Sequence, residues 1–199
     1  MRPAPNLAGR ARATTVLLLV DFLNFLDFDT ARALAPYAVR AARRASALKR
    51  RLAKSRIPAI YANDNFGHWE SDFLAIVETC MARGGASREL AEIMRPSPDD
   101  RSVLKPRHSA FFGTPLEFLL NDLGAKRLIV TGLTTDSCVM FTAQDAYVRG
   151  FRIWVPSDCV AAPKPQFTRD ALTHMARVLK ASTARSTTPL GVAFKSSDN

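Results

Sequence analysis

The stretch that most constrains the fold is a short apolar strand that runs directly into a helix, in the second half of the chain. Residues 128–130 form a β-branched run that predicts a buried strand. Gly132 interrupts this run, and the polar residues 134–137 offer N-caps for a helix whose apolar spacing extends to Gly150. A strand joined in this way to a helix is the repeating unit of α/β proteins.

Cys138 falls in the first turn of this predicted helix. The free N–H groups and the dipole of a helix start favour a thiolate and can also hold an oxyanion, so the position suits a cysteine nucleophile. The alternative is a small buried apolar residue, which describes most free cysteines. The local position alone leaves both interpretations open.

Strands and helices alternate along the rest of the chain. Buried strands are predicted at 14–20, 57–62, 101–104, 128–130 and 151–155, with a sixth, edge strand at 176–181. Helices are predicted at 31–54, 69–82, 87–94, 114–123, 138–150 and 166–175. This alternation predicts an α/β, three-layer Rossmann-like fold, with a six-stranded, mostly parallel sheet and helices on both faces.

One domain, over residues 14–181, is expected, because 199 residues suffice for a single sizeable core. Residues 1–13 lack periodicity and predict a loose N-terminal arm, and the Ser- and Thr-rich residues 182–199 predict a tail that is loose or packed on a partner. No apolar run approaches the roughly 18 residues of a membrane span or forms a signal peptide. We therefore expect a cytoplasmic protein with no membrane partner.

The formal net charge of +10 raises the question of a nucleic-acid partner. Much of this charge lies in residues 40–56, where the basic side chains are spaced around the water-facing side of a helix. No aromatic residue lies among them for base stacking. We expect a solvated basic face, which can attract anionic substrates, and no nucleic-acid partner.

Three reactive side chains stand at equivalent places in the predicted sheet. Asp21, Lys105 and Cys138 each follow a strand at its carboxyl end, and in an open α/β sheet these ends share one edge. Asp21 can accept the thiol proton, Lys105 can stabilise that acid and lower the pKa of the thiol, and Cys138 can attack an sp² carbon. Cys80, Cys138 and Cys159 lie far apart without a C-x-x-C, which argues against a disulfide framework or a zinc site.

These motifs together resemble those of the isochorismatase-like cysteine hydrolases, which include nicotinamidases, N-carbamoylsarcosine amidohydrolases and ureidoacrylate hydrolases. The resemblance covers nearly the whole chain, from about Thr14 to Ala181. It rests on these stretches, in order: Leu-Leu-Val-Asp-x-x-Asn ending at Asn24, Tyr61 to Asp64, Lys105-Pro-Arg-His-Ser-Ala-Phe-Phe-Gly-Thr114, Val130-Thr-Gly-Leu-Thr-Thr-Asp-Ser-Cys-Val139, and Ser157-Asp158.

The resemblance implies a catalytic triad of Asp21, Lys105 and Cys138. It implies an oxyanion hole built from the backbone N–H groups of Thr134 and Cys138, and a non-proline cis peptide bond between Leu133 and Thr134. It also implies a homodimer or homotetramer that acts on a small-molecule substrate. Side chains expected to bind that substrate, although the aromatic ones among them are as often plain core, are Phe22, Asn24, Phe28, Trp69, His108 and Phe112.

The departures from the family pattern bear on metal and substrate. Nicotinamidases bind a divalent metal through an Asp-x-His pair and a further histidine, whereas here Asp64 is followed by Asn65 and Phe66. His68 is nearby, but one displaced histidine does not complete a site. We therefore expect no metal and no other cofactor, and a substrate other than nicotinamide. Whether His68 or Cys159 contributes to the pocket stays open.

The leading hypothesis is hydrolysis of a C–N bond in a small carboxamide, ureido or carbamoyl compound, through a thioester-type intermediate on Cys138. True isochorismatases cleave a vinyl ether by acid catalysis without a cysteine nucleophile, so the cysteine favours C–N hydrolysis. Vinyl-ether hydrolysis that uses Asp21 without a covalent step is the alternative enzyme. A non-enzymatic binding module is the third hypothesis.

Overall fold

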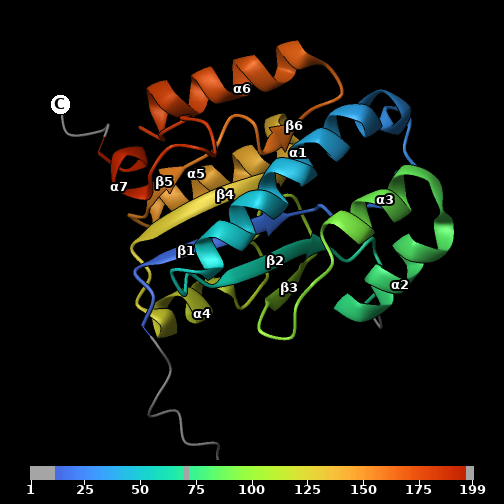
Figure 1. The fold of residues 1–199 in the computed structure, drawn as a ribbon, viewed down its shortest axis with the longest axis horizontal. Helices are drawn as coiled ribbons and strands as arrows, with labels where there is room; N and C mark the ends of the chain where they lie inside the picture. The colour runs from blue at the N-terminus through green and yellow to red at the C-terminus, as the bar shows by residue number, and fades with distance from the viewer. Residues whose placement is uncertain (1–11, 70–71, 196–199) are drawn as a thin grey trace, which may run out of the picture.

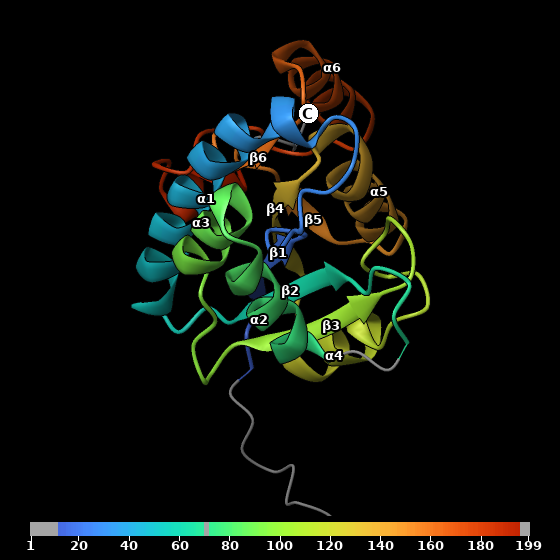
Figure 2. The ribbon, with the colours of Figure 1, turned by 90° about the vertical axis from the view of Figure 1, so that its right-hand side faces the viewer.

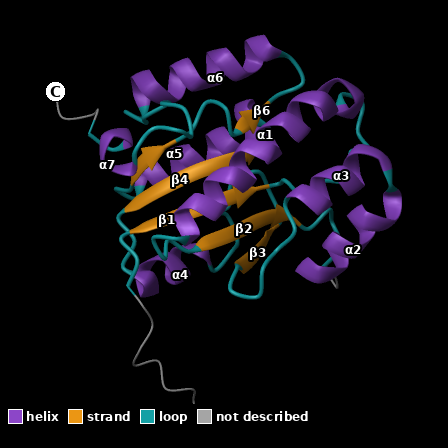
Figure 3. Cartoon of the chain, viewed as in Figure 1, coloured by secondary structure: helices purple, strands orange, loops and turns teal. Residues whose placement is uncertain are grey.

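The structure is a computed structural model, and it describes residues 12–69 and 72–195. The expected N-terminal arm therefore lies almost wholly outside the described residues. The strands, shown in Figures 1 and 3, are β1 (Thr15–Val20), β2 (Ala59–Asp64), β3 (Arg101–Lys105), β4 (Arg127–Leu133), β5 (Arg152–Trp154) and β6 (Val160–Ala161). The helices are α1 (Ala31–Ala53), α2 (Phe73–Arg83), α3 (Gly85–Ile93), α4 (Leu116–Leu123), α5 (Met140–Val148), α6 (Pro165–Val178) and α7 (Leu190–Ala193), with a π-helical turn η1 (Thr135–Val139).

The strands form one six-stranded parallel sheet with the order β3-β2-β1-β4-β5. The short β6 also pairs with β4, beyond the point where β5 ends, through Gly132 and Leu133. This confirms the predicted α/β fold. The order places β1 and β4 side by side at the centre, so the residues directly after them are neighbours at the carboxyl edge.

Helices cover both faces of the sheet, and alternate side chains of each strand face opposite layers. Leu17 and Leu19 of β1 pack into a core beneath α1, α2, α3 and α7, whereas Val16, Leu18 and Val20 pack into a second core beneath α4, α5 and α6. Figure 2 shows the two helical layers around the sheet. Within the described residues, none of the helices combines the length and apolarity needed to cross a membrane.

The predicted sixth strand at 176–181 is wrong. Residues 176–178 continue α6, and the sixth strand is β6. Ala171, Met175 and Leu179 are spaced by four residues and are all buried in the same core, which is a helical pattern rather than an alternating one. β6 has only two residues, too few to show a periodicity in the sequence.

The C-terminal residues up to Lys195 are packed on the domain rather than loose. Ser182 donates its N–H to the Ile153 carbonyl oxygen at 3.0 Å and accepts from the Val155 N–H at 2.8 Å. After α7, the Phe194 side chain is buried edge-on against Trp154, with ring centroids 6.1 Å apart. This segment therefore closes the sheet beside β5.

Candidate active site

The structure brings Asp21, Lys105 and Cys138 into contact at the carboxyl edge of the sheet. Lys105 Nζ lies 2.7 Å from Asp21 Oδ2 and 3.5 Å from Cys138 Sγ. Asp21 directly follows β1, Lys105 ends β3, and Cys138 lies in η1 directly after β4. The predicted convergence of three strand ends is thus present in the fold.

The close approach of β4 to β1 fixes the start of the turn that carries the cysteine. Gly132 lies opposite Val20 with a φ of 134°, and a Cβ at this position would overlap the Val20 carbonyl oxygen. Only glycine fits there. The peptide bond that follows Leu133, between Leu133 and Thr134, is cis, as the family resemblance implied.

Beyond the cis bond the chain coils into η1. The Ser137 and Val139 N–H groups both donate to the Thr134 carbonyl oxygen, at 3.1 and 3.2 Å. This wide turn places Cys138 just before the start of α5 at Met140, with its side chain half-buried and 3.5 Å from the Lys105 ammonium group. The predicted location of Cys138 in the first turn of a helix is confirmed.

Asp21 is held in an uncommon backbone conformation. Its φ is 50°, in the left-handed region, which Asp and Asn tolerate better than other non-glycine residues. Its Oδ1 accepts the backbone N–H of Asp64 at 2.7 Å, which leaves Oδ2 for Lys105. The carboxylate is therefore oriented from two sides.

Lys105 has no solvent-exposed surface, so its ammonium group depends on its partners for solvation. Besides Asp21 and Cys138, Nζ lies 3.5 Å from Asp64 Oδ2 and donates to the Arg107 carbonyl oxygen at 3.2 Å. Burial acts to lower the pKa of Lys105, but the charges of Asp21, Cys138 and Asp64 outweigh it, and the pKa is raised. The side chain is a cation at the centre of the site.

The acid and the thiol are both harder to ionise than usual. Burial raises the pKa of Asp21, partly opposed by Lys105. Burial, and then the charge of Asp21, raise the pKa of the Cys138 thiol to about 12 against the attraction of Lys105. Lys105 acts to lower the pKa of the thiol, as predicted, but the net shift is upward because desolvation and a neighbouring carboxylate outweigh the lysine.

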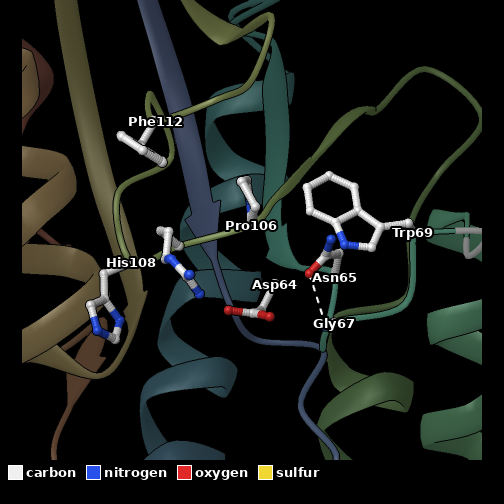
Figure 4. A pocket seen from close by; sticks show the side chains of 8 residues that line it. Asp64, Asn65, Gly67, Trp69, Pro106, His108 and Phe112 are labelled. Carbon is white, nitrogen blue, oxygen red and sulfur yellow. Dashed lines mark hydrogen bonds between the residues drawn. The ribbon is translucent and has the colours of Figure 1, made fainter.

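A cavity of about 500 Å³ opens beside this cluster, between the loops that follow β2 and β3. Figure 4 shows Asp64 near its centre, between Trp69 and His108. The Trp69 side chain is 77% exposed and that of Phe112 is 61% exposed, so the wall is open and aromatic. The residues that line it are Asp64, Asn65, Gly67, Trp69, Pro106, Arg107, His108 and Phe112.

With this geometry in place, comparison with known proteins assigns the family. Residues 15–187 match the family model described as the Isochorismatase domain. The chain belongs to the isochorismatase family. The fold described above is thus that of an isochorismatase-family protein.

This isochorismatase-family chain is similar in sequence or structure to several known proteins. YaaI of Bacillus subtilis (strain 168), an uncharacterised family protein, is 35% identical over 85% of this chain and 92% of its own length. The ureidoacrylate amidohydrolase RutB of Enterobacter sp. (strain 638) is 37% identical, over 47% of this chain and 40% of its own. The structure of N-carbamoylsarcosine amidase from Thermoplasma acidophilum has a TM-score of 0.70 and 29% identity, covering 89% of this chain and 99% of its own.

A nicotinamidase from Staphylococcus aureus shares the fold, with a TM-score of 0.67 and 23% identity over 88% of this chain and 99% of its own. The metal pattern of nicotinamidases does not fit the residues here. Phe66, two residues after Asp64, stacks on Phe25 at 3.9 Å, and the exposed His68 is not on the cavity wall. Within residues 12–69 and 72–195, no three His, Cys, Asp or Glu side chains cluster as a metal site would require.

Three of the six predicted substrate contacts of this isochorismatase-family site lie on the cavity wall: Trp69, His108 and Phe112. Phe22 does not, because the chain turns inward after Asp21 and places this ring, fully buried, in the core beneath α1. Asn24 and Phe28 are also off the wall. The Asn24 Oδ1 instead accepts the Leu26 N–H at 2.9 Å within the loop before α1.

His108 has a contact with Cys138 that the sequence did not predict. Its Nδ1 lies 3.7 Å from Cys138 Sγ and 3.3 Å from Ser137 Oγ, and its ring stacks on Phe141 at 5.4 Å. Asp64 was likewise not assigned to the site, although it ends β2 at the same edge as Asp21. That shared position was the signal that could have identified it.

The other two cysteines are not part of the cavity. Cys80 and Cys159 are fully buried in the core beneath α1, and all three cysteines are free thiols. Burial, followed by the charge of Asp158, raises the pKa of Cys159 to about 12, and this side chain has no solvent-exposed surface from which to reach a substrate. Cys138 is the one cysteine of the described chain that lies beside a lysine and a carboxylate.

Proposed function

We propose that this isochorismatase-family chain hydrolyses a C–N bond in a small carboxamide, ureido or carbamoyl compound through a covalent intermediate on Cys138. The observation that carries the proposal is the buried contact of Lys105 with both Asp21 and Cys138 beside the cavity. The named relatives that are an amidohydrolase and an amidase support the same bond type.

The first half of the reaction joins the substrate to the cysteine. Asp21 takes the thiol proton, Sγ attacks the carbonyl carbon to form a C–S bond, and the carbonyl oxygen becomes an oxyanion. The backbone N–H groups of Thr134 and Cys138 are the proposed oxyanion donors. The C–N bond then breaks, and the amine leaves with the proton returned by Asp21.

The second half releases the acid. Asp21 takes a proton from a water molecule, the oxygen attacks the acyl carbon, and the C–S bond breaks as Sγ regains the proton. Burial raises the pKa of Asp21, which makes the carboxylate a stronger base towards the thiol and the water. Lys105 stays protonated throughout and holds the carboxylate in place.

The cavity wall supports a small substrate with a planar or apolar part and a polar end. Trp69 and Phe112 offer aromatic surface, whereas Asp64, Asn65 and Arg107 offer hydrogen-bonding groups on the same wall. A volume of about 500 Å³ is at the lower end of ligand-binding pockets, which run from roughly 300 to 1,000 Å³.

The test is to incubate the protein with a panel of small carboxamides, ureides and carbamoyl compounds, and to measure amine release and the mass of the intact chain. We expect turnover and an acyl adduct on Cys138. Cys138→Ala should fold, bind and form no adduct, while Ser137→Ala, on the same turn, keeps most of the activity. Turnover by Cys138→Ala at the parent rate would reject the covalent mechanism.

Vinyl-ether hydrolysis is the second candidate, because a raised pKa of Asp21 also suits an acid that donates a proton without a covalent step. It predicts that Cys138→Ala remains active on vinyl ethers whereas Asp21→Asn does not. The same two variants therefore separate the two enzymes. A chain that turns over neither class of compound, yet binds them, fits a binding module.

A further inference from the structure

A second cavity, of about 440 Å³, lies between α1 and α6 at the edge of the sheet that β6 forms. Figure 1 shows β6 and the start of α6 beside α1. It shares no residue with the cavity beside Cys138. Four arginines from three separate segments line it: Arg40 and Arg44 from α1, Arg169 from α6, and Arg185 from the C-terminal segment.

The positive charge of this second cavity is not balanced by its own wall. Asp158 is the one acidic residue among the described residues that line it, so four arginines share the wall with one carboxylate side chain. Both Asp158 oxygens are already engaged, because Oδ1 accepts the Ser186 N–H at 2.7 Å and Oδ2 accepts the Ser186 hydroxyl at 2.9 Å. Arg185 lies 3.7 Å from Asp158 Oδ2.

The other three arginines, Arg40, Arg44 and Arg169, have no neighbouring group in the described parts of the chain that offsets their positive charge. Arg169 donates to the amide oxygen of Gln166 at 2.6 Å, and Arg40 lies over the Tyr37 ring at 5.9 Å. Across the described residues, no ion pair joins Arg40, Arg44 or Arg169 to a carboxylate. Arg40, Arg44 and Arg169 therefore line the cavity without a carboxylate partner among the described residues.

We infer that this second cavity binds a small multivalent anion that carries phosphate or carboxylate groups. Guanidinium forks match both groups in bidentate geometry, and a concave wall concentrates their field. The N-terminus of the 14-residue α6 also opens on the cavity at Pro165 and adds partial positive charge. The volume admits a ligand of metabolite size rather than a single ion.

A bound anion would also bridge elements that line the cavity from different parts of the chain. Arg44 lies on α1 and Arg169 on α6, so an anion held by both ties the two helices together across the cavity. Val160 and Ala161 of β6 line the same cavity and pair with the end of β4. The anion therefore binds the folded chain alone, and its binding raises the melting temperature.

The experiment is isothermal titration of the full chain with inorganic pyrophosphate and, separately, with citrate, at constant ionic strength. The test variant is Arg40→Gln/Arg44→Gln. The control, Arg43→Gln/Arg50→Gln, removes the same charge from the same helix, but these side chains contact Glu89 and Ser46 outside the cavity. We expect saturable one-site binding to the parent and the control, and a loss of about tenfold or more in the test variant.

Absence of saturable binding to the parent would overturn the inference. Equal weakening by both double variants would do the same, because it would reflect only the net charge of the chain. Loss of binding in Arg107→Gln, with the test variant unaffected, would move the anion to the other cavity. If Arg40→Gln/Arg44→Gln does not fold, the exposed Arg169→Gln replaces it, and the ratio of pyrophosphate to citrate affinity separates phosphate from carboxylate ligands.

Discussion

Lys105→Met should cost the protein about 3–4 kcal/mol of unfolding free energy at neutral pH. Lys105 is fully buried and its ammonium group lies 2.7 Å from an Asp21 carboxylate that is itself only 6% exposed. Methionine keeps the length of the side chain but leaves this carboxylate in the interior without a countercharge. The loss comes from that unpaired charge rather than from a cavity.

Protonation of Asp21 limits the size of the effect. At a pH about three units above its pKa, protonating an ordinary aspartate costs about 4 kcal/mol. The folded variant can therefore avoid any larger penalty by taking up a proton at Asp21. Asp64, the second acid beside Lys105, has a side chain that is 34% exposed and is solvated by water when the lysine is removed. The cost therefore arises mainly at Asp21.

The sign of the pH dependence is set by the same charge. Burial already raises the pKa of Asp21, and removing Lys105 removes the main attraction that opposes this rise. A carboxyl group whose pKa is higher in the folded state destabilises the fold above that pKa and not below the unfolded value. The deficit of Lys105→Met relative to the parent should therefore shrink from neutral pH to about pH 4.

Urea denaturation followed by circular dichroism, at neutral and acidic pH, measures these differences if the slopes of the transitions agree. The matched variant is Asp21→Asn/Lys105→Met, which removes both charges and should recover much of the stability that Lys105→Met loses. Equal stabilities of the single and the double variant at neutral pH would refute the reasoning, because the unpaired carboxylate would then not be the cause.

The site and the fold support three further predictions. Since burial and Asp21 raise the pKa of Cys138 to about 12, iodoacetamide should label this thiol slowly at neutral pH. The labelling rate should rise about tenfold for each pH unit up to about pH 12. Asp21→Asn should speed the labelling, and an unchanged rate would contradict the statement that Asp21 raises the pKa of this thiol. Gly132→Ala should abolish folding, seen as lost soluble yield, whereas Gly191→Ala, with open space around it, should not. His108→Phe should lower kcat/KM about tenfold, the worth of one hydrogen bond to the thiol, and parent-like kinetics would exclude that role.

The sequence was sufficient for the architecture and for the convergence of the reactive residues, because both depend on long apolar strands and on the residues at their carboxyl ends. Asp21, Lys105 and Cys138 each lie at or just beyond the end of a strand of five residues or more, long enough to show its pattern. β6 has two residues, too few to show a periodic pattern. The predicted helix at 166–175 ended too early, because α6 continues to Val178.

The electrostatics and the walls of the site could not be predicted in the same way. The pKa of Cys138 depends on how deeply tertiary packing buries the thiol, whereas the local sequence shows only a helix start that favours ionisation. Phe22 and Phe112 both lie in segments that follow a strand at the carboxyl edge, yet one is fully buried and the other is 61% exposed. That difference depends on the backbone direction after each strand.

The left-handed backbone at Asp21 restricts which residues can occupy this position independently of any chemistry. Asp and Asn are the side chains that tolerate this conformation and can also accept the Asp64 N–H, so Asp21→Ala would disturb the backbone as well as remove a base. The backbone conformation alone would therefore favour an aspartate or asparagine at this position, even in a related protein without activity. For the proposed mechanism, the presence of Lys105 and Cys138 in such a protein is therefore a better marker of retained activity than the presence of Asp21.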